Sequence, residues 1–285
     1  MAPAMGDPVI ERLRVALGDR YDISDELGRG GNARIFRSRD RRDARAVAIK
    51  ALRPEIAGAL GPDRFVREMD IATRLHHAQI VPLLDSGNAG GILWYAMPLI
   101  EGGSLLHHLE REGRLPVPSA VRIARDVAAA LDYAHTHGVV HRDITPGNIL
   151  LSGTATLVTD FGVARAIDEA ARQPLTDSGI VVGTPAYISP EQARDAKRVD
   201  HRTDIYALGC VLYEMLAGDP PFHGATPHAV LARHAADPVP PLRTVRPEVS
   251  PGLEAVVLHA LAKQPPDRPP TAAALRDALR PHTDG

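Results

Sequence analysis

Three side chains in the middle of the chain have the types that phosphoryl transfer requires. Asp143 ends the segment His-Arg-Asp, Asn148 follows five residues later, and Asp160 begins Asp-Phe-Gly after an apolar hairpin segment. A carboxylate can accept the proton of an attacking hydroxyl, and amide and carboxylate oxygens are ligands that suit Mg²⁺. The spacing therefore predicts a catalytic base, Asp143, and a metal site formed by Asn148 and Asp160.

A glycine-rich segment nearer the N-terminus has the composition of a phosphate-binding loop. Gly28, Gly30 and Gly31 lie between two strand-like segments, and Lys50 follows in Val-Ala-Ile-Lys. Glycines let backbone amides approach phosphate oxygens closely, and a lysine on the next strand contributes a point charge. Alone, the pattern also fits an ordinary glycine-rich hairpin with a surface lysine.

The first half of the sequence has the pattern of an antiparallel sheet. From Tyr21 to Leu99, short apolar or β-branched runs are separated by Gly, Asp and Asn. Between them, Pro62 to His77 has apolar residues at helical spacing, with Glu68 beside the apolar stripe. The predicted strands are Val47 to Leu52, Ile80 to Leu84 and Ile92 to Leu99.

The second half of the sequence has helical periodicity. Apolar residues from Val117 to Ala134 line one face of a helix that ends at Gly138. Asp204 to Leu216 is apolar on nearly every face, which predicts a helix surrounded by protein. Two further helices are predicted, Pro251 to Lys263 and Thr271 to Arg280, and residues 163–187 form a long loop of the kind that usually serves a function.

The composition is that of a folded globular protein. The 285 residues, of which 44% are hydrophobic and 24% charged, suffice for a two-lobed domain or two small domains. With 33 basic and 35 acidic residues the net charge is -2, which provides no electrostatic footprint for nucleic acid. The single Cys210 lies in an apolar run, so we expect a buried thiol in a reducing compartment.

Neither a membrane segment nor a signal peptide is predicted. No run of about 18 consecutive apolar residues occurs. Residues 1–20 lack the continuous apolar core of a signal peptide. We therefore expect a cytoplasmic chain, either by itself or as the cytoplasmic part of a longer membrane protein.

The order of these motifs resembles that of the eukaryotic-like Ser/Thr protein kinases of bacteria, from about Tyr21 to Arg280. A further segment, Gly-Thr-Pro-Ala-Tyr-Ile-Ser-Pro-Glu at 183–191, resembles the kinase segment that receives the substrate peptide. The resemblance implies an α+β, two-lobed protein-kinase-like fold with ATP in the cleft between the lobes. It implies a small antiparallel β lobe with one regulatory helix at 21–99, a larger mainly helical lobe at 101–280, an N-terminal extension at 1–20 and a C-terminal tail at 281–285.

The resemblance also implies roles in catalysis and ATP binding. Lys50 would bind the α and β phosphates of ATP and pair with Glu68 of the regulatory helix. Asn148 and Asp160 would ligate Mg²⁺ or Mn²⁺. The implied ATP-binding residues are Leu27, Gly28, Arg29, Gly30, Gly31, Ala33, Ile35, Ala48, Lys50, Met97, Pro98, Ile100 and Leu150.

Other residues have implied structural roles. Glu191 would pair with Arg268, which would compensate the burial of both charges. Asp204 would cap the central helix and hold the backbone of the catalytic loop. His141 and Phe161 would stack in the internal spine that aligns the lobes.

By the same resemblance, the loop at 163–187 would be the activation segment. Its Thr176 and Ser178 are the expected autophosphorylation sites, and Arg142 would supply a cation for the phosphate. The implied partners are a protein substrate and a second copy of the chain, in a homodimer that autophosphorylates in trans.

Two residues depart from the family's pattern. Ala33 replaces the third glycine of the loop and adds only a methyl group. Thr145 stands where these kinases usually have a lysine that stabilises the transferring phosphoryl group, so we expect a rate lower by roughly 10²-fold or more. Thr145 also leaves open an ATP-binding pseudokinase that acts as a scaffold. A small-molecule phosphotransferase would share the base and metal ligands, but residues 183–191 with Arg268 argue against it.

Overall fold

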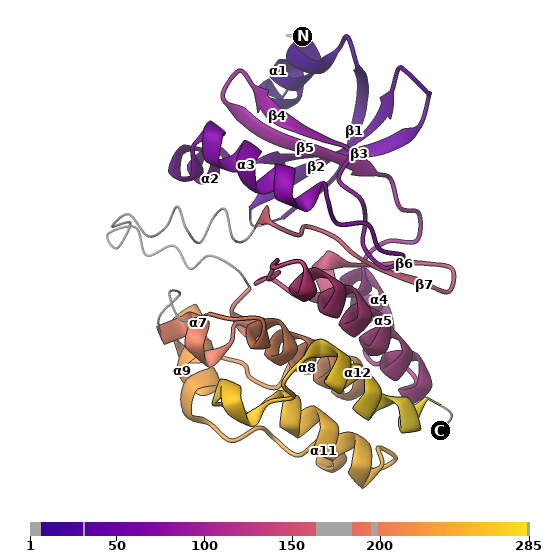
Figure 1. The fold of residues 1–285 in the computed structure, drawn as a ribbon, viewed down its shortest axis with the longest axis vertical. Coiled ribbons are helices and arrows are strands. Elements are labelled where there is room, and N and C mark those ends of the chain that lie inside the picture. Colours follow the sequence, from indigo (N-terminus) through magenta and orange to yellow (C-terminus); the bar gives the residue numbers. More distant parts are fainter. Residues whose placement is uncertain (1–6, 31, 164–183, 195–198, 284–285) are drawn as a thin grey trace, which may run out of the picture. The chain divides into compact units, whose positions relative to one another are not determined.

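The computed structural model of the chain describes residues 7–30, 32–163, 184–194 and 199–283. These residues belong to two compact units (Figure 1). The first unit contains 7–76, apart from 31, and 81–99. The second contains 77–80 and the described residues from 100 onwards.

The first unit contains a five-stranded antiparallel sheet with the strand order β1-β2-β3-β5-β4. Strands β1 and β4 are therefore its edges. The elements in chain order are α1 (Pro8–Leu17), β1 (Tyr21–Arg29), β2 (Ala33–Asp40), β3 (Ala46–Leu52), α2 (Pro54–Leu60), α3 (Pro62–Ala72), β4 (Asp85–Ala89) and β5 (Ile92–Pro98).

The sheet has one apolar face that packs into a core. Along β3, Val47, Ile49 and Ala51 belong to this core, and the residues between them point to the opposite face because side chains alternate along a strand. The core also contains Tyr21 and Trp94, whose rings meet edge to face with centroids 5.7 Å apart.

Helix α1 covers this core and packs on both edge strands, β1 and β4. Its N-cap is Asp7, whose carboxylate accepts a hydrogen bond from the backbone amide of Val9. Leu13 is fully buried in the core, while Val9 is partly buried against it. Residues 8–17, which the sequence analysis assigned to an N-terminal extension, are thus packed as part of the first unit.

Two local predictions for this half of the chain are wrong. The predicted strand at Ile80 to Leu84 is absent, and within it Ile80 makes only an isolated bridge, because Pro82 has no amide proton for a ladder. The predicted helix from Pro62 ends at Ala72 rather than His77. At this end the hydroxyl of Thr73 donates to the backbone carbonyl of Asp70. Such a side-chain bond competes with the backbone hydrogen bonds of a helix, which favours its end here.

The second unit is mainly helical and is built around α8 (Arg202–Ala217). Helices α5, α10, α11 and α12 all pack on α8, whose residues from Thr203 to Leu216 are all buried, including Cys210 (Figure 1). The helices in chain order are α4 (Leu105–Glu112), α5 (Val117–Thr136), α7 (Pro190–Arg194), α8, α9 (Pro227–Ala236), α10 (Leu242–Val245), α11 (Pro251–Ala260) and α12 (Ala272–Leu279), and a hairpin is formed by β6 (Ile149–Ser152) and β7 (Ala155–Val158).

The predicted α+β organisation, a sheet followed by a mainly helical half, is confirmed. The four helices predicted in the second half correspond to α5, α8, α11 and α12. None of the helices in the described part of the chain is long and apolar enough to cross a membrane.

We expect Leu13→Ala to destabilise the first unit by about 2–4 kcal/mol, because it opens a cavity in a fully buried position. Val15→Ala, on the same helix but with a side chain that is 86% exposed, should change stability by no more than about 0.5 kcal/mol. Urea denaturation of both variants and of the wild type measures this difference. Equal stabilities would show that α1 is not packed on the sheet in solution.

Candidate active site

Asn148 and Asp143 are in direct contact in the second unit. The side-chain nitrogen of Asn148 donates to the backbone carbonyl of Asp143 at 2.8 Å and to the Oδ2 of its carboxylate at 3.0 Å. These two bonds fix the orientation of the carboxylate that was predicted to act as the base. They also occupy the nitrogen of the Asn148 amide, so its Oδ1 is the atom that a cation would meet.

Asp160, the second predicted metal ligand, lies just beyond β7. The backbone amide of Thr159 donates to the carbonyl of Asn148 at 3.0 Å, which ties the two ligand segments together. The hydroxyl of Thr159 donates to Oδ1 of Asp160 at 3.1 Å. Asp160 has a φ of 72°, a conformation that is uncommon for a residue with a Cβ and often occurs at functional sites.

The donor set suits a hard divalent cation. Mg²⁺ is usually bound by one or two side-chain oxygens and completed by water and substrate phosphates. Asn148 and Asp160 offer such oxygens, whereas the described residues contain no group of three or more His, Cys, Asp or Glu side chains that could hold a metal by themselves. The residues therefore fit a metal that binds together with a phosphate substrate.

His141 connects the catalytic loop to the Asp160 segment. Its Nε2 donates to the carbonyl of Thr159 at 2.8 Å, and its Nδ1 accepts from the amide of Asp143 at 3.2 Å. The imidazole is fully buried and meets the ring of Phe161 edge to face, with centroids 4.6 Å apart. The sequence prediction that His141 stacks on Phe161 therefore agrees with the geometry.

The carboxylate of Asp204, on α8, holds the backbone of the catalytic loop. It accepts hydrogen bonds from the amides of His141 at 2.8 Å and Arg142 at 2.7 Å, and its Oδ2 lies 2.8 Å from Nε2 of His135. Burial alone would raise the pKa of Asp204, but these hydrogen bonds and the nearby imidazoles outweigh burial and lower the pKa. Asp204 therefore stays ionised.

One detail of the prediction for Asp204 is wrong. It does not cap α8, because the helix begins at Arg202 and His201 occupies the N-cap position. Asp204 lies in the first turn instead, where a negative charge is favoured by the helix dipole.

Glu191 and Arg268 form a buried ion pair. The guanidinium donates to both carboxylate oxygens, at 2.6 and 2.7 Å, and the Arg268 side chain has no exposed surface. Arg268 also donates to the carbonyl of Ala262 and lies 4.7 Å from the ring centroid of Tyr206. The pair therefore joins α7, which begins within the predicted substrate segment, to the loop after α11.

Ser189, in the predicted substrate segment, is fully buried. Its hydroxyl lies 2.6 Å from the hydroxyl of Thr203, which in turn donates to the side chain of Gln192 at 2.7 Å. The side-chain Nε2 of Gln192 donates to the backbone carbonyl of Arg142 at 2.9 Å. This chain of bonds links the predicted substrate segment to the catalytic loop.

The roles of His135 and Gln192 were not predicted from the sequence, in which His135 falls near the end of the helix that stops at Gly138. Both act through contacts with residues far away in the chain, and neither lies in a motif with a characteristic spacing. No signal in a single sequence marks such positions.

In the first unit, the strand register places four predicted ATP-binding residues on one face of the sheet. Ile35 lies opposite Lys50, and Ala48 lies opposite Met97. Ala48 and Lys50 are two residues apart on β3, so all four side chains share the face that is not in the apolar core. Lys50 is 7% exposed, and Glu68 on α3 is 6% exposed, which makes both charges buried.

The remaining predicted residues are distributed over both units or fall outside the description. The loop turn is closed by a bond from the Gly30 amide to the Ala33 carbonyl at 2.8 Å. Leu27 and Arg29, near the end of β1, are exposed, and Pro98 ends β5. Ile100 and Leu150 belong to the second unit. Gly31, Thr176 and Ser178 lie outside the described residues.

Thr145 is buried in the catalytic loop, with 7% of its surface exposed. Its backbone carbonyl accepts from the amide of Asn148 at 3.0 Å, which closes the turn between the predicted base, Asp143, and the predicted metal ligand, Asn148. The backbone geometry of the loop is therefore formed without a lysine at this position.

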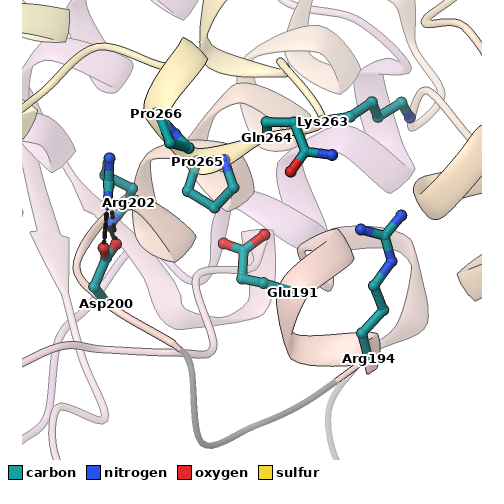
Figure 2. A pocket seen from close by; sticks show the side chains of 8 residues that line it. All are labelled: Glu191, Arg194, Asp200, Arg202, Lys263, Gln264, Pro265 and Pro266. Atoms are coloured by element: carbon teal, nitrogen blue, oxygen red, sulfur yellow. Dashed lines mark hydrogen bonds and ion pairs between the residues drawn. The ribbon is translucent and has the colours of Figure 1, made fainter.

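A pocket of about 500 Å³ lies beside Glu191 and is distinct from the predicted ATP-binding set. Figure 2 shows Arg202 bonded to Asp200 at its wall. Lys263, also at the wall, donates to the carbonyl of His234 at 2.9 Å, and burial lowers its pKa to about 8. The other lining residues are Arg194, Gln264, Pro265 and Pro266. The acidic and basic groups named here are paired within the protein, and the pocket holds none of the predicted catalytic residues.

Comparison with known proteins identifies related sequences over nearly the whole chain. The protein kinase domain family matches residues 21–279. The serine/threonine-protein kinase PknB of Mycolicibacterium smegmatis is 43% identical over 276 residues, which cover 93% of this chain and 43% of PknB. The DNA damage-responsive serine/threonine-protein kinase RqkA of Deinococcus radiodurans is 40% identical over 264 residues, which cover 91% of this chain and 39% of RqkA. The chain thus spans less than half the length of these relatives.

The fold is also that of a solved kinase structure. The crystal structure of Rad53 residues 1–466 in complex with AMP-PNP superposes with a TM-score of 0.75 at 23% identity, covering 96% of this chain and 68% of that one. This similarity confirms the predicted protein-kinase-like fold.

We expect Arg268→Ala to destabilise the second unit by about 3–5 kcal/mol, because it leaves the Glu191 carboxylate, only 11% exposed, without a counter-charge. Arg233→Ala is the matched control, since Arg233 is 53% exposed and lies 3.8 Å from Asp237, and it should cost less than about 1 kcal/mol. Thermal and urea denaturation measure both. A similar loss in the two variants would contradict the buried pair.

Proposed function

Because the chain belongs to the protein kinase domain family, we propose that it is a Ser/Thr protein kinase that transfers the γ-phosphoryl group of ATP to protein hydroxyls. The observation that carries the proposal is the bonded pair of Asn148 and Asp143, with Asp160 tied to the same loop through Thr159. The names of the relatives, which are serine/threonine-protein kinases, support the substrate class.

Each residue then has a defined task in the transfer. The Asp143 carboxylate, oriented by the Asn148 amide, accepts the proton of the substrate hydroxyl. Asn148 and Asp160 would hold Mg²⁺ or Mn²⁺, which when bound would neutralise charge on the phosphate oxygens. Asp204 keeps the backbone on the N-terminal side of Asp143 in place through the amides of His141 and Arg142.

In the first unit, the face that carries Lys50 is assigned to the nucleotide. Lys50 binds the α and β phosphates and pairs with Glu68, and the turn with Gly28 and Gly30 covers the phosphates. Ile35, Ala48 and Met97 lie on the same face of the sheet as Lys50 and offer apolar surface for adenine.

We expect Asp143→Asn to reduce transfer of labelled phosphate from ATP by at least about 10²-fold, because asparagine cannot accept the proton. The control is Asp277→Asn on α12, where the carboxylate is 68% exposed, and this variant should keep the wild-type rate. Mass spectrometry of the same samples should locate phosphate at Thr176 and Ser178 in the wild type. Nucleotide binding by the wild type without any transfer would contradict the proposal.

Thr145 favours a second candidate function, a pseudokinase that binds ATP without transferring phosphate efficiently. A lysine here would place a cation near the transferring group, whereas threonine is uncharged. We therefore expect Thr145→Lys to raise the transfer rate by about tenfold or more. Thr145→Val, which removes the hydroxyl without adding charge, is the control. An unchanged rate in Thr145→Lys would refute the charge argument.

A further inference from the structure

Four charged side chains connect α1 to the strands that carry the glycine-rich turn. We call Asp7, Glu26, Arg29 and Arg34 the loop-anchor cluster. Asp7 is the N-cap of α1, Glu26 and Arg29 lie on β1 before the turn, and Arg34 lies on β2 after it. The cluster therefore joins a segment outside the matched kinase family, 21–279, to the turn assigned to the nucleotide phosphates.

Arg34 is the centre of the cluster. Its Nη1 and Nη2 donate to the two carboxylate oxygens of Asp7 at 2.8 and 2.6 Å. Its Nε and Nη2 donate to the carboxylate of Glu26 at 3.0 and 2.7 Å. A guanidinium can hold two carboxylates in this way because its donors point in fixed directions within one plane, which an ammonium group cannot reproduce.

The cluster is more strongly coupled than a typical surface ion pair. The Arg34 side chain is only 14% exposed, and its guanidinium lies 5.1 Å from the ring centroid of Phe36. The hydrogen bonds from Arg34 lower the pKa of Asp7 and of Glu26 to about 2. Both carboxylates thus remain ionised at any physiological pH, and the cluster does not act as a pH switch.

The cluster lies where β1 leads into the glycine-rich turn and β2 leaves it. Arg29 and Arg34 are directly opposite in the β1–β2 register, and the next bond toward the tip joins Gly30 to Ala33. The guanidinium of Arg29 donates to both carboxylate oxygens of Glu26, at 2.7 and 3.0 Å. Its Nη2 lies 3.7 Å from Oδ2 of Asp7. Strands β1 and β2, on either side of the turn, are therefore both linked through arginines to the carboxylates of Asp7 and Glu26.

Helix α1 can serve as an anchor because it is itself fixed to the sheet. Leu13 is buried in the core, and the guanidinium of Arg14 donates to the carbonyls of Ile23 and Ser24 on β1 at 3.0 and 2.9 Å. The position of Asp7 therefore follows from packing that does not involve the turn.

We propose that Arg34, held by Asp7 and Glu26, is a positioning residue that preorganises the glycine-rich turn for nucleotide phosphates. The inference rests on the proposed function, since it assigns the turn to ATP. A turn whose flanking strands are already held in place loses less conformational freedom when the nucleotide binds. Loss of the anchor should therefore weaken nucleotide binding more than it slows the transfer step.

The decisive variant is Asp7→Asn, because asparagine caps a helix about as well as aspartate but carries no charge. We expect faster backbone hydrogen exchange in the peptide from Leu27 to Ile35 without nucleotide. We also expect a dissociation constant for a non-hydrolysable ATP analogue, and a KM for ATP, raised about fivefold, with kcat within about twofold of wild type. Arg34→Lys should have at least as large an effect.

Two controls separate positioning from general stability. Glu11→Gln removes a charge from the same helix, where Glu11 pairs with Arg14 at 2.9 Å, and should leave exchange and affinity unchanged. Leu13→Ala lowers the stability of the first unit without removing a cluster side chain. Measured well below its unfolding temperature, it should keep a nucleotide affinity closer to wild type than that of Asp7→Asn.

The outcomes distinguish the inference from the proposed function. Unchanged exchange and affinity in Asp7→Asn and Arg34→Lys, or an equal effect of Glu11→Gln, would overturn the positioning role while leaving the kinase assignment intact. A wild-type chain that binds no nucleotide by calorimetry would overturn the proposed function and, with it, the role of the cluster in nucleotide binding. Exchange in the turn would then report only on the packing of the strands.

Discussion

The buried carboxylate of Asp204 is the constraint on which the catalytic loop depends. It receives two consecutive backbone amides and one imidazole, so a charge with no solvent contact is stabilised by three donors. Arg142 has a φ of 68°, a conformation that costs of order 1–3 kcal/mol for a non-glycine residue. The hydrogen bonds of Asp204 offset that cost. The preceding residue, His141, connects this loop to the Asp160 segment, because its Nε2 donates to the carbonyl of Thr159.

In the first unit, the corresponding constraint is the two-sided character of β3. Val47, Ile49 and Ala51 are held in the apolar core, which fixes the register of the strand. Lys50 and Ala48 must then lie on the other face, since a shift by one residue would place the lysine in the apolar core and move the apolar residues to the opposite face. The packing of α1 on the core thus also determines which face of the sheet carries the residues assigned to the nucleotide.

Much of the candidate site could be predicted from the sequence, because its residues lie in short motifs with characteristic spacing. The proximity of Asn148 to Asp143 and the stacking of His141 on Phe161 follow from neighbouring segments. The errors arose where local pattern was a poor guide. The run at Ile80 to Leu84 is apolar enough for a strand but contains Pro82. Helix α1 was not predicted, although Asp7 and Pro8 suit a helix start and its apolar residues Val9, Ile10, Leu13 and Leu17 share one face. Its packing on the sheet is what the sequence could not show.

The sequence alone determined the motif order, the change from sheet to helices, and the residue types available for phosphoryl transfer, because these depend on local spacing and periodicity. Only the tertiary structure decided which distant charges meet. His135 and Asp204 are 69 residues apart and Asp7 and Arg34 are 27 apart, and neither pair was predicted. The pairing of Glu191 with Arg268, 77 residues apart, was expected only from the family resemblance. A buried or half-buried charge needs a partner, but which partner it finds is set by how helices and strands pack, and no local pattern in one sequence records that choice.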